Sequence, residues 1–85
     1  MSSSQEVLFL RVENGELNWF ENGNEDSDGK YSGEIKNGKP NGQGTHTYSN
    51  GEKFVGKWKG GMPWNGTKYN KNGEILGKWA NGKYQ

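Results

Sequence analysis

Three stretches of the chain alternate large apolar residues with glycine and polar residues. These triplets are Tyr31-x-Gly33-x-Ile35, Phe54-x-Gly56-x-Trp58 and Ile75-x-Gly77-x-Trp79. A period of two puts the large residues of a triplet on one face of a β-strand, and no window shows the apolar stripe of a helix. We therefore predict an all-β protein without helices, with strands near residues 6–12, 16–21, 30–36, 44–48, 53–59, 66–70 and 74–79.

The dipeptide Asn-Gly separates many of these segments and occurs eight times in the chain. Both of its residues tolerate the positive φ of a type I′ turn, which makes it the strongest short hairpin signal. Strands joined one after another by hairpins form an antiparallel meander. A single elongated antiparallel β-meander is thus the fold that we predict.

The glycine at the centre of each triplet needs a physical reason, because a mid-strand glycine weakens a sheet. The cost falls where an aromatic ring from a neighbouring strand lies over the vacant Cβ position. Each triplet supplies a large side chain beside a glycine, so we expect a ladder of rings over glycines on one face. One unit cannot bury its rings alone, so neighbouring units must stabilise one another.

The triplets belong to an internal repeat. Gly29, Gly51 and Gly73 are spaced by 22 residues. The segments between the triplets share further positions, namely Pro40/Pro63, Gly44/Gly66 and Tyr48/Tyr69. We interpret the chain as an array of similar hairpins.

The segment YSGEIKNGKPNGQG, residues 31–44, resembles the MORN repeat, whose outline is Y-x-G-x-x-x-x-G-x-x-x-G-x-G. A second copy, FVGKWKGGMPWNG, lacks one glycine of the G-x-G pair, and a third, ILGKWANGK, is partial. The resemblance covers residues 28–83 and implies partner binding, scaffolding and membrane attachment. A glycine-aromatic repeat of bacterial antitoxin-like proteins fits YNKNGEILGKWANGK nearly as well. The matched positions are Tyr31, Gly33, Gly38, Gly42 and Gly44 in the first copy and Phe54, Gly56, Trp58, Gly61 and Gly66 in the second.

The length of 85 residues corresponds to one small domain or a short repeat array. We expect a disordered tail at 1–5, a degenerate N-terminal capping hairpin at 6–27 and MORN-type repeats at 28–85. The repeats divide into residues 28–50, 51–72 and a partial unit at 73–85. In the capping hairpin, Trp19-Phe20 replaces the inner glycine.

The composition favours a folded protein whose core consists of rings. Hydrophobic residues make up only 27% of the chain, but four tryptophans, four tyrosines and three phenylalanines are among them. The chain has no cysteine, which excludes disulfides and thiolate metal sites. The N-terminal apolar run, Val7 to Leu10, is too short for a signal peptide, so we expect a cytoplasmic location, with peripheral membrane attachment as the alternative.

Residues for catalysis or metal binding are scarce. His46 is the only histidine, and we expect it to be packed or at the rim of the sheet. The acidic segment NEDSDG, residues 24–29, resembles the start of a calcium loop, but Ile35 stands where the bidentate glutamate is due. We therefore predict a protein that is not an enzyme and has no metal or cofactor.

The charge is divided between the two parts of the chain. Residues 1–29 hold one arginine against seven carboxylates, and residues 30–85 hold ten lysines against three glutamates. Such a basic part could bind an anionic membrane surface. Nucleic acid is disfavoured, because the rings are committed to the sheet and arginine is nearly absent. The candidate residues for an anionic surface are Lys30, Lys36, Lys53, Lys57, Lys59 and Lys78.

The hypothesis we prefer is a non-catalytic protein-interaction or scaffolding module. Aromatic residues dominate binding hot spots, and Trp64, beside Pro63 in an expected turn, is the best candidate for an exposed ring. The alternatives are peripheral binding to anionic lipids and an antitoxin- or immunity-like binding role, and self-association is also open. The candidate residues for partner binding are Tyr31, Phe54, Trp58, Trp64 and Trp79.

Overall fold

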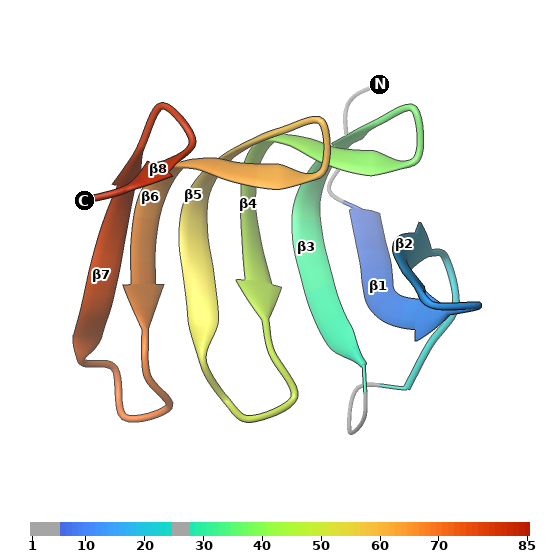
Figure 1. The fold of residues 1–85 in the computed structure, drawn as a ribbon, viewed down its shortest axis with the longest axis horizontal. Coiled ribbons are helices and arrows are strands. Elements are labelled where there is room, and N and C mark those ends of the chain that lie inside the picture. The colour runs from blue at the N-terminus through green and yellow to red at the C-terminus, as the bar shows by residue number, and fades with distance from the viewer. Residues whose placement is uncertain (1–5, 25–27) are drawn as a thin grey trace.

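The computed structural model of the chain describes residues 6–24 and 28–85. These residues form eight strands and no helix, so the all-β prediction is confirmed (Figure 1). Residues 1–5, and part of the segment that resembles a calcium loop, lie outside the described residues. The strands are β1 (Glu6–Glu13), β2 (Glu16–Phe20), β3 (Gly29–Lys36), β4 (Lys39–Thr47), β5 (Lys53–Lys59), β6 (Met62–Tyr69), β7 (Ile75–Ala80) and β8 (Lys83–Tyr84).

All strands pair antiparallel in one sheet, in the order β2-β1-β3-β4-β5-β6-β7-β8. From β3 onward each strand pairs with the next along the chain, as the predicted meander requires. The N-terminal hairpin departs from that order, because β1 rather than β2 pairs with β3, through Leu8 opposite Tyr31. Strand β2 is therefore one edge strand of the sheet, and β8 is the other.

Two of the eight Asn-Gly pairs lie inside strands and not in turns. Asn41-Gly42 belongs to β4 and Asn65-Gly66 to β6, so both strands begin earlier than the sequence predicted. The side chains of the two asparagines serve the turn of the next hairpin. The backbone N–H of Gly60 donates to Oδ1 of Asn41 at 3.1 Å, and that of Asn81 donates to Oδ1 of Asn65 at 2.9 Å. Each hairpin thus stabilises its successor.

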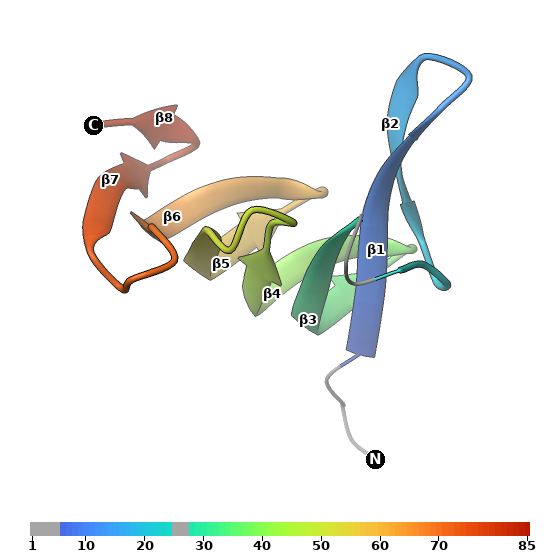
Figure 2. The same cartoon turned by 90° about the horizontal axis from the view of Figure 1, so that it is seen from below.

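The sheet curls strongly, and Figure 2 shows β1–β2 and β7–β8 at its two ends turned toward the same side. Trp19 of β2 and Trp58 of β5 have ring centroids 6.2 Å apart. Four strand spacings separate β2 from β5, which would amount to about 19 Å in a flat sheet. The outline measures 30 × 29 × 24 Å, so the array is compact. The prediction of an elongated meander was wrong on this point.

The core lies on the concave side of this curl. One cross-strand row there consists of Leu8, Tyr31, His46 and Phe54, each opposite the next. The rings meet edge to face, for example Tyr31 with Trp58 at 5.2 Å between centroids. The fully enclosed apolar core is therefore small, and it consists of Leu8, Tyr31, Phe54 and Trp58.

A row of glycines runs beside this row of rings. Gly33, Gly44, Gly56 and Gly66 are successive cross-strand partners on β3 to β6. The ring of Tyr31 occupies the space that a Cβ at Gly44 would need, and Phe54 does the same at Gly66. The expected ring-over-glycine packing is present, but it covers the partner glycines on β4 and β6. The triplet glycines Gly33 and Gly56 instead have positive φ, 156° and 154°, and approach the backbone of those partners.

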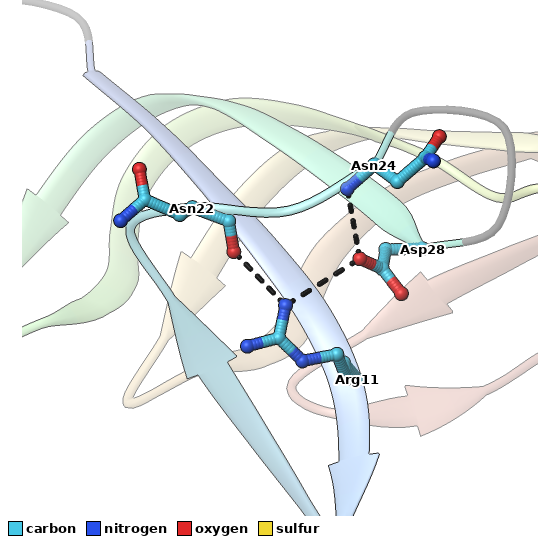
Figure 3. A network of polar contacts seen from close by, with 4 residues as sticks. All are labelled: Arg11, Asn22, Asn24 and Asp28. Atoms are coloured by element: carbon cyan, nitrogen blue, oxygen red, sulfur yellow. Dashed lines mark hydrogen bonds and ion pairs between the residues drawn. The ribbon is translucent and has the colours of Figure 1, made fainter.

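A polar network anchors the connection from β2 to β3 (Figure 3). Nη1 of Arg11 donates to the backbone carbonyl of Asn22 at 3.0 Å and lies 3.6 Å from Oδ2 of Asp28. The backbone N–H of Asn24 donates to the same carboxylate oxygen at 2.9 Å. The Arg11 guanidinium also lies 3.9 Å from the ring centroid of Phe20. These contacts connect β1 to Phe20 at the end of β2 and to residues Asn22, Asn24 and Asp28 between β2 and β3.

Candidate functional site

Three of the five rings expected to bind a partner are core residues. Tyr31, Phe54 and Trp58 are only 0%, 1% and 4% exposed, so they support the sheet and do not form its surface. Trp79 is half-buried and packs edge to face on Phe54 at 5.6 Å. The structure thus brings these four rings together in one stack. Burial raises the pKa of Tyr31 to about 12, with a further contribution from Glu34.

Trp64 stands apart from the stack. It lies within β6, not in a turn, and is half-buried rather than exposed. Its ring covers Gly82, and the ammonium of Lys59 lies 4.5 Å from its ring centroid. The hydrogen bond from Gly82 N to the Trp64 carbonyl explains this position, because it fixes the last turn against β6. Trp64 of β6 therefore packs against the turn between β7 and β8.

An apolar hollow of about 260 Å³ opens on the concave face, between β1–β2 on one side and the start of β6 on the other. The hairpin β1–β2 contributes Leu10, Leu17 and Trp19 to its wall because the sheet curls β2 over the face of β4 and β5. We call it the apolar hollow. Its lining consists of Leu10, Leu17, Trp19, His46, Tyr48, Trp58, Gly61, Met62 and Pro63.

Large apolar side chains stand exposed at the rim of the apolar hollow. Leu17 is 64% exposed and Met62 is 62% exposed. Val12, the cross-strand partner of Leu17, is exposed to a similar degree. Single exposed apolar residues are ordinary, whereas contiguous exposed apolar patches are typical of interaction surfaces. No sequence pattern singles out Leu17, Trp19 and Met62, because these residues come together only through the curl of the sheet.

His46 lies in the floor of the apolar hollow and is only 1% exposed. Its ring packs edge to face on Tyr48 and Trp19, with centroids 4.5 and 5.4 Å away. Within the described residues neither ring nitrogen has a hydrogen-bond partner. Burial, assisted by the nearby Lys68 ammonium, lowers the pKa of His46 to about 4. The histidine is therefore neutral near pH 7, and its packed position agrees with the expectation from sequence.

The side chain of Lys68 completes the polar border of this region. Its ammonium lies 3.3 Å from a carboxylate oxygen of Glu52 and 4.7 Å from the ring centroid of Tyr48. Burial raises the pKa of Tyr48, although Lys68 opposes that shift. With a phenol held protonated and an imidazole held neutral, the floor presents rings and little charge.

The lysines expected to bind an anionic surface occupy two regions. Lys30 and Lys53 lie in one cross-strand row with Thr47, on the face opposite the rings. On that face Lys57 stands opposite Asn65 and Lys78 opposite Thr67. Lys57 and Lys78 each alternate with ring-bearing positions of their strands and therefore project away from the rings.

Lys36 and Lys59 lie near the hairpin turns at one end of the strands. There they line a second hollow together with Lys39, which sequence analysis did not select. Lys36 and Lys39 are direct cross-strand partners that flank the turn Asn37-Gly38. The sequence could have revealed this pair, because the residues on either side of a two-residue hairpin turn are cross-strand partners.

The described part of the chain holds no group of three or more histidine, aspartate or glutamate side chains that could bind a metal ion. It also contains no helix long and apolar enough to cross a membrane.

Comparison with known proteins gives one match. Residues 31–53, which comprise most of β3, all of β4 and the turn that leads to β5, match the family model of the MORN repeat. No curated protein and no solved structure matches the chain. The further copies at 51–72 and 73–85 stay predictions, although Gly56 pairs with Gly66 as Gly33 pairs with Gly44.

Proposed function

The chain carries a MORN repeat at residues 31–53, and we propose that it is a non-catalytic protein-interaction module. Repeats of this family are often linked to protein or membrane binding and are generally not enzymes. The observation that carries the proposal is the apolar hollow, with Leu17 and Met62 exposed at its rim. A partner side chain that occupied the apolar hollow would also cover Leu17 and Met62.

Burial of the rim side chains would contribute favourably to binding. Full burial of a leucine or methionine side chain stabilises a complex by about 1.5–3 kcal/mol, before the cost of association. The rings of the floor are held in place by the core, so they lose little freedom on binding. Such preorganised aromatic anchors are typical of binding hot spots.

The experiment compares partner recovery from a native cell extract by the wild type and by three single variants. Leu17→Ser and Met62→Ser each remove one side of the rim. Ile75→Ser is the matched control, because Ile75 is 59% exposed and does not line the apolar hollow. Circular dichroism confirms that each variant is folded.

We expect either rim variant to recover at least about tenfold less of the partner than the wild type, since 1.4 kcal/mol corresponds to tenfold in affinity. The control should recover as much as the wild type. Equal recovery by the wild type and both rim variants would show that the apolar hollow does not bind the partner.

Peripheral binding to anionic membranes is a second candidate. The observation that favours it is the group Lys30, Lys53, Lys57 and Lys78, which lies on the face opposite the rings. Lysines near an anionic surface contribute about 1 kcal/mol each. Sedimentation with phosphatidylserine vesicles at low and high salt tests it, with Lys53→Ala/Lys57→Ala as the variant. Absence of binding at low salt would exclude this candidate.

A further inference from the structure

The apolar hollow does not end at its own rim. A neighbouring hollow, which we call the middle segment, shares the lining residues Leu17, Trp19 and Gly61 with it. The middle segment is also lined by Asn37 and Gly60. A side chain at Gly61 would press on the indole nitrogen of Trp19, 3.1 Å from the Cβ position, so the glycine keeps this passage open. The middle segment in turn shares Lys39 with the lysine-lined hollow.

The three hollows therefore adjoin, with the apolar hollow at one end and the lysine-lined hollow at the other, and the side chains of Trp19 and Lys39 approach each other at Gly61. We call the three together the groove. We call the basic end, lined by Lys36, Lys39 and Lys59, the lysine end. The β5–β6 turn contributes to both ends, through Gly60 at the lysine end and Gly61 at the apolar hollow. The β3–β4 turn places Lys36 beside Lys39, and the β5–β6 turn at Gly60 and Gly61 joins Lys59 to the wall of the apolar hollow.

The lysine end takes part in neither ion pair found within the described part of the chain, which are Arg11 with Asp28 and Lys68 with Glu52. The Lys59 ammonium lies over the ring of Trp64, a contact that leaves its charge in place. Lys36 and Lys39 stand directly opposite each other across the ladder, and such a like-charge pair is destabilising. An anionic ligand would relieve this repulsion.

We propose that the groove binds an extended acidic segment of a partner protein. One large apolar side chain of that segment occupies the apolar hollow, and neighbouring carboxylates pair with Lys36, Lys39 and Lys59. This inference rests on the proposed function and adds the chemistry of the partner. It follows from charge complementarity, because the apolar and basic ends adjoin.

The test is a titration of the full ¹⁵N-labelled chain with blocked pentapeptides, followed by NMR. The first peptide has a central leucine between two aspartates on either side. A second replaces the leucine by alanine, and a third replaces the aspartates by lysines. The indole N–H signals of Trp19 and Trp58 report on the apolar hollow, and that of Trp79, outside it, is the internal reference.

We expect saturable shifts of Trp19 and Trp58 with the first peptide only. Single variants Lys36→Ala, Lys39→Ala and Lys59→Ala should each weaken its binding by about 1.4- to 5-fold, as exposed ion pairs do. Lys71→Ala is the matched control and should bind as the wild type does, because Lys71 is exposed in the β6–β7 turn at the other end of the strands. Raising the salt concentration should weaken binding by the wild type more than by the lysine variants.

The outcomes separate this inference from the proposed function. Equal binding of the acidic and basic leucine peptides, or no effect of the three lysine variants, would overturn the acidic partner and leave the apolar site standing. Shifts produced by phosphatidylserine vesicles or by a rise in protein concentration, and not by the acidic peptide, would also overturn it, in favour of a membrane or a second copy. Loss of partner recovery is measured independently with Leu17→Ser and Met62→Ser.

Discussion

The row of glycines can be tested at a single position, Gly44. A methyl group there would overlap the ring of Tyr31, which is fully buried. The Tyr31 hydroxyl also donates to the backbone carbonyl of Glu34 at 2.6 Å, which further fixes the ring. Gly44 does not have a positive φ, so alanine is compatible with its backbone and the substitution probes space alone.

The expected cost of Gly44→Ala is about 3 kcal/mol. Overpacking a core costs about 1–3 kcal/mol, and complete loss of a large aromatic side chain costs about 3–5 kcal/mol. Displacement of the Tyr31 ring falls between these limits. A domain of 85 residues has a free energy of unfolding of only about 4–13 kcal/mol, so the variant should be close to unfolding.

Urea unfolding followed by tryptophan fluorescence measures this cost. With an m-value near 1 kcal/mol/M, the midpoint should fall by about 3 M. Gly15→Ala is the control, because a Cβ there meets nothing within 4 Å and only the φ of 81° is unfavourable. It should cost about 1–2 kcal/mol. A wild-type midpoint for Gly44→Ala, or an equal cost of Gly44→Ala in a Tyr31→Leu background, would refute the steric overlap with Tyr31.

Three further predictions concern other contacts. The pKa of His46 is about 4 in the folded chain and about 6.5 unfolded, so stability should fall by about 3 kcal/mol as the pH drops from 6.5 to 4. Urea midpoints across this range test this, and His46→Leu should flatten the dependence; an equally steep profile in the variant would contradict the assignment. Arg11→Ala should lower stability by about 1–2 kcal/mol, since it removes a charged hydrogen bond and a cation–π contact, and unchanged thermal melting would refute this. Asn41→Ala should cost about 0.5–1.5 kcal/mol and speed hydrogen exchange at Gly60, whereas exchange there as slow as in the wild type would argue against the cross-repeat bond.

The period-two pattern was sufficient to predict most strands. Tyr31, Gly33 and Ile35 alternate in β3 as expected, because alternation is a local property of an extended backbone. The Asn-Gly signal was less reliable. Asn37-Gly38 forms a turn with φ of 55° and 76°, whereas Asn41-Gly42 continues β4. Which pair turns depends on pairing with the neighbouring strands, and that is not local.

The candidate site was predicted only in part. Trp58 was selected from the triplet and does line the apolar hollow, but as a buried floor residue. Leu17 and Met62 carry no signal in a local window, because each is a single apolar residue near a turn. Lys36 was selected and Lys39 was not, although the two become direct partners once the turn between them forms.

The sequence by itself determined the repeating hairpin, the ring beside the glycine and the family of the repeat at residues 31–53. These depend on neighbours within a few residues, where backbone geometry leaves few choices. Only the tertiary structure decided that β1 pairs with β3, which leaves β2 at the edge. The curl then carries Trp19 to Trp58 across four strand spacings and creates the apolar hollow. The curl results from the twist that accumulates over all strand pairs and from the close strand approach that the glycine row allows. No single segment of the sequence therefore predicts it.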